Sequence, residues 1–369
     1  MNVYLDNAAT TPLSQDMKYY LCSMLDIYEN PSNVYEGGLQ ARRIINESRH
    51  DVAQFLNADD NEIIFTSSGS ASNTLGIVGY INQCGKDVTL YYSSIAHKSI
   101  QECAKDNNGV AIPVDKDGLI DIDWLEMNLK TDKNHKLVVV DYANSEIGTI
   151  QDVYKIMHIV HDNNGVCLLD CTGSISSIQI DVEKLNVDMV VFSAHKLGAL
   201  KGCGVLYKKK GIQLKPLVYG SQEYGLFGGT ENLLGIASLG KAIRDYQYGG
   251  NAKANRDYVY KYIQNNIPDS YLIGSTDRLC NNLYMCFNGV SGETLMILLD
   301  MNGIQVSTGS ACSSGDKTDS PTLLAIGMSG KDIRSCIRMC FSGDETLEEL
   351  DYVCNQLKQN ISVLRLLSW

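Results

Sequence analysis

The stretch Val187-Asp188-Met189-Val190-Val191-Phe192-Ser193-Ala194-His195-Lys196 leads from an apolar run to a polar end that contains a lysine. The apolar run predicts a buried β-strand, so the lysine falls just beyond the carboxyl end of that strand. The earlier run Val166-Cys167-Leu168-Leu169-Asp170 ends in a carboxylate in the same way. Functional sites of parallel sheets gather at the carboxyl ends of the strands. We therefore expect Asp170, Ser193 and Lys196 to face one site.

Short strand-like segments alternate with amphipathic segments through the first two thirds of the chain. Segments 71–84, 95–107 and 153–163 have the helical spacing of apolar residues and lie between strand candidates. This alternation predicts βαβ units, and hence an α/β fold whose mostly parallel seven-stranded sheet is covered by helices on both faces. The strand candidates are 62–66, 87–93, 110–114, 137–142, 166–170, 188–193 and 204–207.

The pattern changes after about residue 240. A helix over 241–265, short strands over 282–287 and 304–306, and helices near 293–300 and 347–366 predict a smaller α+β domain. No low-complexity linker separates this part from the rest. We expect a large domain over 15–245 and a small domain built from 1–14 and 246–369, with the site between them.

The chain has 369 residues and a net charge of −12, which disfavours nucleic acid as a direct partner. The basic run Lys208-Lys209-Lys210 follows a strand candidate, and a solvated turn explains it. No secretory signal is visible at the start of the sequence, and no apolar run approaches the roughly 18 residues that span a bilayer. These features predict a cytoplasmic protein without a membrane segment.

The twelve cysteines are scattered along the chain and form no paired CxxC units, so we expect no metal site. Cys167 and Cys171 belong mostly to a strand candidate. Cys336 and Cys340 have the spacing of two residues on one helix face, but two ligands alone make a poor metal site. In a reducing compartment we expect most of these thiols to be small buried hydrophobes.

The strand-end lysine and carboxylate suggest a specific cofactor. A lysine amine can condense with the aldehyde of pyridoxal phosphate (PLP), and a carboxylate can pair with the protonated nitrogen of its pyridine ring. A lone lysine after a strand is more often a solvated loop residue. On Asp170, Lys196 and the neighbouring Ser193 and His195 alone, a PLP site and a solvated loop are equal alternatives.

Five motifs, in a fixed order, resemble those of one enzyme family. Nearly end to end, the chain resembles the cysteine desulfurases, in the class V aminotransferase group of fold-type I PLP enzymes. The resemblance implies a PLP-dependent homodimer with the active site between its large and small domains. The motifs are Tyr4-Leu5-Asp6-Asn7-Ala8-Ala9-Thr10-Thr11-Pro12, Asn30-Pro31-Ser32, Asn144-Ser145-Glu146-Ile147-Gly148, Ser193-Ala194-His195-Lys196 and Gly309-Ser310-Ala311-Cys312.

The segment Phe65-Thr66-Ser67-Ser68-Gly69-Ser70 ends a strand candidate and opens a helix candidate, so its N–H groups and hydroxyls can face an anion. A serine-rich helix cap without a ligand is the commoner meaning of such a string. The resemblance implies that Gly69 and Ser70 hold the cofactor phosphate together with Ser193 and His195. It also implies that Thr230 reaches the phosphate of the neighbouring subunit.

The resemblance assigns the groups around the cofactor ring and the substrate. It implies that Asp170 pairs with the ring nitrogen and that His97 stacks on the ring and shuttles protons. Asn144 corresponds to a residue that contacts the cofactor hydroxyl and the substrate, and Asn33 to a substrate residue. Arg338 corresponds to the arginine that binds the substrate α-carboxylate, a task that suits the two-pronged guanidinium.

Cys312 lies in a stretch of small residues, 307–315, that we expect to form a mobile loop. A buried structural thiol is the default reading of a cysteine, but a thiol in such a loop can travel to a substrate. The resemblance implies that Lys196 removes the α-proton of L-cysteine and that Cys312 takes its sulfur as a persulfide. Alanine is then released, and the persulfide passes to an acceptor protein or a reductant.

Several positions depart from the family pattern. Gly173, Phe227 and Tyr35 stand where the family usually has a glutamine, an arginine and a histidine, and 197–202 lacks the usual Tyr-Gly-Pro. The segment from Cys312 to Pro321 is slightly longer than in short housekeeping members, and little chain follows the last helix. We expect the protein to keep PLP binding and persulfide chemistry despite these changes. A specialised role in sulfur delivery is compatible with them.

Two alternatives remain at the level of sequence. One is another fold-type I PLP enzyme, a selenocysteine lyase or an aminotransferase. The other is a degenerate, non-catalytic sulfur-carrier subunit, motivated by Gly173 and Phe227. The residues do not identify the acceptor, so iron-sulfur clusters, tRNA, DNA and cofactors all stay open as destinations of the sulfur.

Overall fold

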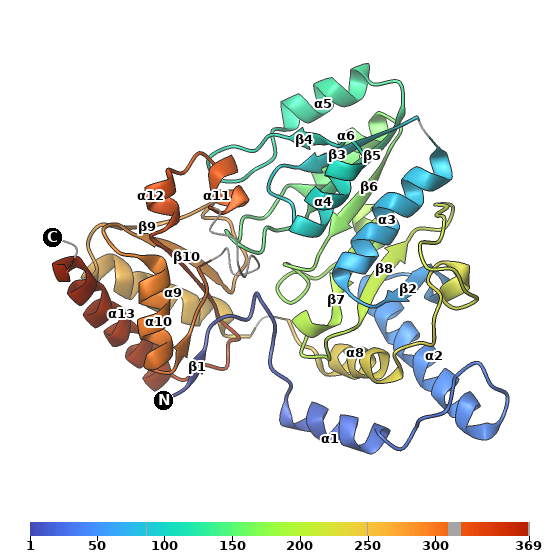
Figure 1. The fold of residues 1–369 in the computed structure, drawn as a ribbon, viewed down its shortest axis with the longest axis horizontal. Helices are drawn as coiled ribbons and strands as arrows, with labels where there is room; N and C mark the ends of the chain where they lie inside the picture. Colours follow the sequence, from blue (N-terminus) through green and yellow to red (C-terminus); the bar gives the residue numbers. More distant parts are fainter. Residues whose placement is uncertain (86, 249, 309–318, 368–369) are drawn as a thin grey trace.

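A computed structural model describes residues 1–85, 87–248, 250–308 and 319–367. Its largest element is a seven-stranded sheet with the strand order β2-β8-β7-β6-β5-β3-β4, which lies to the right in Figure 1. All seven strands coincide with strand candidates of the sequence. They are β2 (Ile63–Thr66), β3 (Val88–Ser93), β4 (Val110–Ile112), β5 (His135–Asp141), β6 (Gly165–Asp170), β7 (Met189–Ser193) and β8 (Gly204–Lys208).

Helices cover both faces of this sheet, as the alternating pattern predicts. In β5, Leu137 and Val139 belong to the core cluster that includes helices α3 (Gly69–Cys84) and α4 (Lys98–Asp106). Val138 and Val140 point to the opposite face and join the cluster that includes α6 (Val153–Asp162). Successive side chains of a strand face opposite sides, so a strand covered twice is apolar throughout. The α/β fold class is confirmed.

One strand breaks the parallel arrangement. β8 pairs antiparallel with both β7 and β2, whereas β3, β4, β5, β6 and β7 pair in parallel. The chain leaves β7 through the short 3₁₀ turn Ala194–Lys196 and returns along β8. The lysine therefore lies in the connection at the carboxyl end of β7, beside the carboxyl end of β6.

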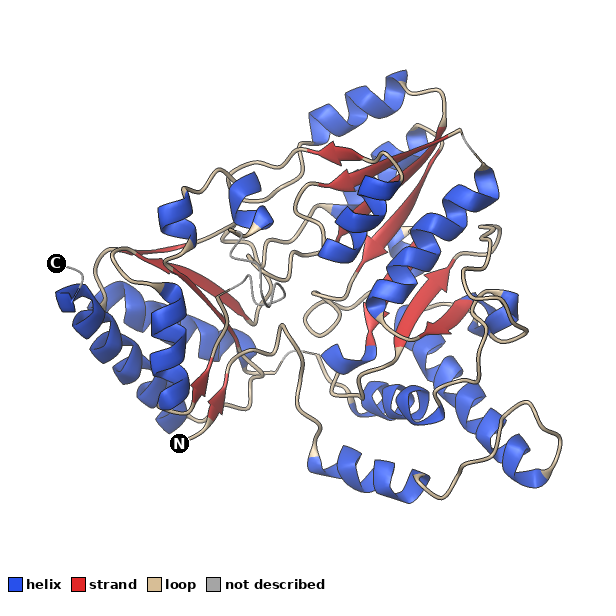
Figure 2. Ribbon diagram, viewed as in Figure 1, coloured by secondary structure: helices blue, strands red, loops and turns tan. Residues whose placement is uncertain are grey.

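The C-terminal third forms separate sheets, on the left of Figure 1. β9 (Ser270–Leu272), β10 (Asn282–Phe287) and β12 (Cys336–Cys340) make an antiparallel sheet of order β12-β10-β9. β11 (Ile304–Gln305) pairs in parallel with β1 (Val3–Tyr4), so the first residues lie beside this part, as Figure 2 also shows. Helices α9 (Ala252–Asn266), α10 (Gly292–Met301) and α13 (Leu347–Leu367) share one hydrophobic cluster with these strands.

Two expectations about this part are wrong. The single helix predicted over 241–265 is two helices, because α8 (Leu233–Asp245) ends at Tyr246, whose backbone is extended. The Tyr246 and Tyr248 rings pack against Phe55 at centroid distances of 6.3 and 5.8 Å. That aromatic packing fixes the chain between the two helices. Cys336 and Cys340 do not share a helix face, since both lie on β12.

The remaining helices connect these layers. α2 packs against α8 below the large sheet, and α1 packs beside α8 as well. α11 and α12 precede β12 in the chain. These helices are α1 (Gln15–Met24), α2 (Glu36–Leu56), α5 (Ile122–Thr131), α7 (Val182–Leu185), α11 (Pro321–Ala325) and α12 (Gly330–Ile333).

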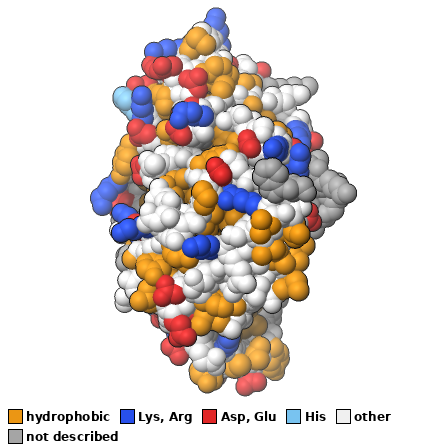
Figure 3. All heavy atoms as spheres, turned by 90° about the vertical axis from the view of Figure 1, so that its left-hand side faces the viewer, with side chains coloured by type: hydrophobic (Ala, Val, Ile, Leu, Met, Phe, Trp, Pro, Cys, Tyr) orange, Lys and Arg blue, Asp and Glu red, His pale blue; other side chains and the backbone are white. Residues whose placement is uncertain are grey.

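The surface shows no dominant charge on the side that is on the left in Figure 1. Lys, Arg, Asp and Glu side chains lie among hydrophobic ones over this face (Figure 3). Within the described ranges, no helix combines the length and apolar composition needed to cross a membrane. The same residues contain no group of three or more His, Cys, Asp or Glu side chains that could hold a metal ion.

Candidate active site

A cavity of about 480 Å³ lies at the carboxyl ends of β5, β6 and β7. The strand ends of the large sheet and the helix starts and loops that follow them form most of its wall, and Asp6, Ala8 and Arg338 close it from the N-terminal segment and β12. Ten further polar side chains line it. They are Ser68, Ser70, Asn73, His97, Asp141, Ser145, Asp170, Thr172, Ser193 and His195, with Lys196 between the two parts.

Asp170 is held in one orientation at the end of β6. It is 3% exposed, and its Oδ2 accepts a hydrogen bond from Asn73 Nδ2 at 2.7 Å. Its Oδ1 accepts from the backbone N–H of Thr172 at 2.8 Å. A buried carboxylate with this orientation is suited to pair with a cationic group in the cavity.

A second carboxyl group lies next to it. Asp141 ends β5 and is the direct register partner of Asp170 in the parallel pairing of β5 with β6. Burial, reinforced by the Asp170 carboxylate, raises the pKa of Asp141 well above its usual value. Burial next to a second carboxyl group therefore disfavours the ionised form of Asp141.

Lys196 extends its amine into the same cavity. Nζ donates hydrogen bonds to the backbone carbonyls of Ala8 and Ala9, the latter at 3.0 Å. These carbonyls belong to the N-terminal segment, which is further tied to the turn because Thr11 donates to the His195 carbonyl at 2.8 Å. The predicted convergence of Asp170, Ser193 and Lys196 at one site is thus present in the structure.

The N-terminus of α3 forms the anion-binding end of the cavity. Ser68 caps this 16-residue helix by accepting from Ala71 N at 3.1 Å, and Gly69 and Ser70 supply its first turn. A Cβ on Gly69 would lie 3.3 Å from Thr172 Oγ1 and 3.4 Å from Ser193 Cβ, so glycine allows this close approach. Backbone N–H groups at a helix start favour phosphate.

His195 completes this end of the cavity as a neutral group. Burial, and next the charges of Lys196 and Lys201, lower the pKa of His195 to about 4. Its Nδ1 lies 3.0 Å from the hydroxyl oxygen of Thr10. At neutral pH His195 therefore offers a hydrogen-bonding imidazole rather than a positive charge.

His97 also lines the cavity, at the start of α4. Its Nδ1 accepts from the backbone N–H of Ser99 at 3.2 Å and is 2.8 Å from the Ser99 hydroxyl oxygen. These contacts fix the ring while one side of it borders the cavity. The ring is exposed, so a group bound in the cavity can reach its face.

Arg338 closes the cavity from β12. Its guanidinium donates from Nη2 to Asp6 Oδ1 at 2.8 Å and from Nη1 to the Ser145 carbonyl at 3.1 Å. Its Nε is buried and has no hydrogen-bond partner among the described residues. These contacts use two of the five N–H donors of the guanidinium, and Nε is among the donors left for a further acceptor.

Four predicted site residues are not placed in this cavity. Asn144 is buried beside it, donating to the Ile95 carbonyl at 2.8 Å and accepting from the N–H groups of 146 and 147. Thr230 is exposed and lines a neighbouring pocket of about 100 Å³. Asn33 is exposed and donates to the Tyr35 hydroxyl at 2.8 Å. Cys312 lies outside the described residues.

Sequence reasoning missed Asp6, Asn73, Asp141 and Thr172 as residues of the cavity. Asp141 had a usable signal, because it follows the apolar run 137–140 in the same way as Asp170 follows its own apolar run. Asn73 lies one helical turn after Gly69, which places it on the cavity side of α3. No sequence pattern marks Asp6 and Thr172 as cavity residues, because only the folded structure brings their segments together.

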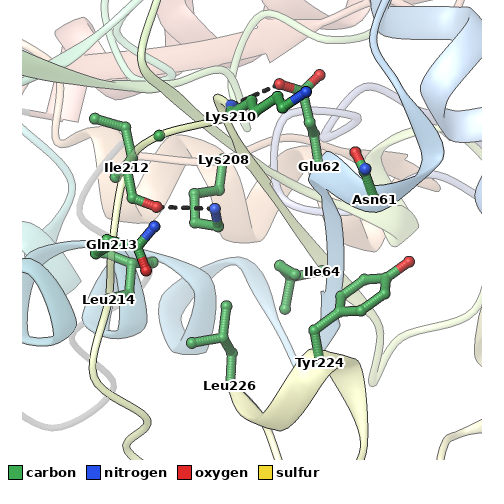
Figure 4. A pocket seen from close by; sticks show the side chains of 11 residues that line it. Asn61, Glu62, Ile64, Lys208, Lys210, Ile212, Gln213, Leu214, Tyr224 and Leu226 are labelled. Carbon is green, nitrogen blue, oxygen red and sulfur yellow. Dashed lines mark hydrogen bonds between the residues drawn. The ribbon is translucent and has the colours of Figure 1, made fainter.

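A separate pocket of about 360 Å³ lies at the far end of β2 and β8 (Figure 4). Lys208 donates there to the Ile212 carbonyl at 2.9 Å, and the backbone N–H of Lys210 donates to Glu62 Oε1 at 2.7 Å. These contacts account for two members of the basic run. The pocket lacks the strand-end lysine and carboxylates of the larger cavity.

The cavity matches the three chemical parts of PLP. Asn73 Oδ1, Asp141 Oδ2 and Thr172 Oγ1 are buried in its wall without a partner within the described part of the chain. Such atoms are costly unless a ligand or water satisfies them. Lys196 suits the aldehyde, Asp170 the pyridinium nitrogen, and the start of α3 the phosphate.

Comparisons with known proteins agree with this geometry. The class-V aminotransferase family matches residues 3–353. Cysteine desulfurase IscS 1 of Archaeoglobus fulgidus is 35% identical over 378 residues, which cover 99% of this chain and 98% of that protein. The solved structure of a NifS-like protein has a TM-score of 0.89 at 28% identity and covers 98% of this chain and 100% of its own.

A second solved structure, described as SspA in complex with cysteine, has a TM-score of 0.82 at 26% identity. The alignment covers 94% of this chain and 100% of that one. Because the family match spans nearly the whole sequence, the chain belongs to the class-V aminotransferases, which are PLP-dependent enzymes of fold type I. Within that family it is a cysteine desulfurase.

Proposed function

We propose that the enzyme removes the sulfur atom of L-cysteine in the cavity at the ends of β5, β6 and β7 and receives it on Cys312. The observation that carries this proposal is the convergence of Asp170, Lys196 and Arg338 on one cavity. Bound PLP supplies an aldehyde that condenses with amines and a ring that takes up electrons from the substrate carbon. Asp170, Lys196 and the start of α3 are the groups that would hold it.

Arg338 orients the substrate. Its fork is anchored on Asp6 and on the Ser145 carbonyl, and Nε remains for the α-carboxylate of L-cysteine. Lys196 is the base that would remove the α-proton, because its amine reaches into the same cavity. His97, fixed through Ser99, is the second group able to move a proton near the ring.

Cys312 completes the reaction. Its thiolate attacks the sulfur of L-cysteine, so an S–S bond forms while the substrate C–S bond breaks. The bond electrons return to carbon, which takes a proton and leaves as L-alanine. The balance is L-cysteine plus the Cys312 thiol giving L-alanine plus a Cys312 persulfide, and no external oxidant or reductant is needed for this step.

The test is mass spectrometry of the purified yellow enzyme after addition of L-cysteine, with Cys312→Ser as the control. We expect the Cys312 peptide to gain one sulfur atom and L-alanine to be released in equal amount. Alanine release without sulfur on Cys312 would assign the thiol role elsewhere. Faster turnover of selenocysteine than of cysteine would favour a selenocysteine lyase. Formation of a keto acid would favour an aminotransferase, and no reaction would favour a non-catalytic sulfur-carrier subunit.

The assembly and the acceptor form the rest of the proposal. Thr230 is exposed on the 223–232 segment, away from its own cavity, which supports a role toward a second subunit of a homodimer. A sulfur-acceptor protein then takes the persulfide sulfur from Cys312. Light scattering of the holoenzyme tests the dimer, and a Thr230→Ala variant with unchanged cofactor affinity would contradict the shared phosphate site.

A further inference from the structure

Tyr284 is a buried residue whose hydroxyl contacts the chain leading to Cys312. It is 0% exposed on β10, and its Oη is 3.1 Å from the carbonyl oxygen of Thr308 and 3.2 Å from Glu146 Oε1. Thr308 is the last described residue before Cys312 in the sequence. The hydroxyl therefore contacts the N-terminal end of the Cys312 segment directly.

The same region also holds the C-terminal end of that segment. Ser320 is 1% exposed and caps α11 by accepting from Leu323 N at 3.3 Å. Leu323 belongs with Tyr284 to one buried hydrophobic cluster. Burial raises the pKa of Glu146, while hydrogen bonding from Ser320 opposes that rise. Glu146 is thus in contact with both Tyr284 and the start of α11.

These contacts connect with the substrate-binding arginine. Tyr284 is the register partner of Arg338, and Arg338 exchanges two backbone hydrogen bonds with Ser307, at 2.6 and 3.1 Å. Tyr284, Arg338 and Ser307 therefore stand in one row across adjacent strands. On the other side, Arg338 Nη1 donates to the carbonyl of Ser145, the neighbour of Glu146. The row and the Ser145–Glu146 segment form one closed network.

The chemistry of the groups fits this arrangement. A tyrosine hydroxyl has one proton to donate and lone pairs that accept. The Tyr284 hydroxyl lies within donating distance of both Glu146 Oε1 and the Thr308 carbonyl, so its single proton is shared between these two acceptors. Buried polar groups left unsatisfied are costly, so removal of one member weakens the segments that it contacts directly.

We propose that Tyr284 and Glu146 are positioning residues that hold the two ends of the Cys312 segment against the strand carrying Arg338. This inference rests on the proposed role of Cys312 as the sulfur-accepting thiol. Tyr284 and Glu146 do not contact the reacting atoms. They set where the segment begins and ends relative to the bound substrate, so they affect sulfur transfer and not substrate uptake.

The first test uses the PLP-loaded Tyr284→Phe enzyme. The ring remains in the core, and only the hydroxyl is lost. We expect the absorbance change of the cofactor on adding L-cysteine to keep its native rate. The rate of persulfide formation on Cys312 should fall about tenfold. Rapid quenching and mass spectrometry measure this rate. Equal slowing of both steps, or of neither, would overturn the positioning role.

The matched control is Tyr352→Phe. The Tyr352 hydroxyl also donates to a backbone carbonyl, that of Asn302, at 2.9 Å, but on α13 away from the cavity. We expect native rates for both steps in this variant. A tenfold loss in the control as well would show that any lost tyrosine hydroxyl in this part has the same effect, and would reject the specific role.

A second measurement does not depend on desulfurase activity. Hydrogen exchange of the holoenzyme should be faster in peptides covering 303–308 and 320–326 in Tyr284→Phe, and unchanged in Tyr352→Phe. In Glu146→Leu we expect faster exchange at 320–326 alone, because Tyr284 still bonds to Thr308. Unchanged exchange at both ends in Tyr284→Phe overturns the inference. Absence of persulfide on Cys312 in the native enzyme instead overturns the proposed function, and exchange still decides the anchoring.

Discussion

Arg338 and Asp6 form a buried ion pair, 2.8 Å between Nη2 and Oδ1, although 332 residues separate them in the sequence. The Asp6 carboxylate fixes one arm of the guanidinium, and the Ser145 carbonyl fixes the other. The fork is therefore held before any substrate arrives, which reduces the entropy lost on binding.

The Arg338→Lys variant tests this pre-arranged fork. A lysine keeps the charge but cannot bond Asp6, the Ser145 carbonyl and a substrate carboxylate at the same time. We expect kcat/KM for L-cysteine to fall about 30-fold or more, mostly through KM. Initial rates of alanine formation measure the effect. The control is Arg244→Lys, which changes the surface pair with Asp51 and should leave the kinetics unchanged. An unchanged KM in Arg338→Lys would show that Arg338 does not bind the substrate.

Gly173 lies at a closely packed point of the cavity wall. A Cβ there would lie 2.9 Å from the Ala143 carbonyl oxygen and 3.1 Å from Ser145 Cβ. Restoring a side chain at this departure from the family pattern forces the 143–145 backbone to move. We expect Gly173→Ala to weaken PLP binding about tenfold, measured by titrating the cofactor-free protein.

Gly250→Ala is the control for that prediction. Gly250 is exposed, and a Cβ there would meet no atom within 4 Å. Its cofactor affinity should match that of the native protein. Native affinity in Gly173→Ala would mean that the 143–145 segment adapts at no cost and that the glycine is not required.

Glu223 forms a buried pair with Arg49 and stabilises the fold near the predicted phosphate residues. Nη1 and Nη2 of Arg49 donate to its two oxygens at 2.8 and 2.7 Å, and Glu223 also accepts from Phe65 N. Removing one partner of a buried pair costs about 3–5 kcal/mol. We expect Glu223→Ala to lose free energy of unfolding of that order in urea. Glu102→Ala, which breaks an exposed pair with Lys105, should leave the free energy of unfolding nearly unchanged.

His195 gives the cofactor-free protein a pH-dependent contribution to stability. Its pKa is about 4 in the fold, mainly because of burial, against 6.5 without the fold. Between these values the unfolded chain binds the proton and the folded chain does not, so stability rises with pH. His195→Gln should remove on the order of 2 kcal/mol of this dependence. Urea unfolding of both proteins at pH 4.5 and 7 tests it, and an identical pH dependence would refute it.

The large sheet was predictable because its signals are local. Each strand covered on both faces is a short apolar run, and a carboxylate or lysine at its end is visible without knowing what pairs with it. For that reason the positions of Asp170 and Lys196 followed from the sequence. Asp141 carries the same signal as Asp170, and a stricter reading of strand ends would have included it.

The other parts of the site depend on contacts between distant segments. No local pattern places Asp6 against Arg338, or shows that Cys336 and Cys340 continue a sheet rather than a helix. The first two helices, over Gln15–Met24 and Glu36–Leu56, were not predicted. The second of them combines many polar residues with a narrow buried stripe, so its apolar spacing is hard to recognise. The domain boundaries, the cytoplasmic location and the individual residue roles stay predictions.

The N-terminal segment has a consequence for the order in which the enzyme is made. β1 pairs with β11, Asp6 with Arg338, and Ala8 and Ala9 with Lys196. Each of these links joins the first ten residues to chain that leaves the ribosome much later. Residues 1–10 must therefore wait for residue 340 before they can settle, and the cofactor can be captured in a closed cavity only after β12 has been synthesised.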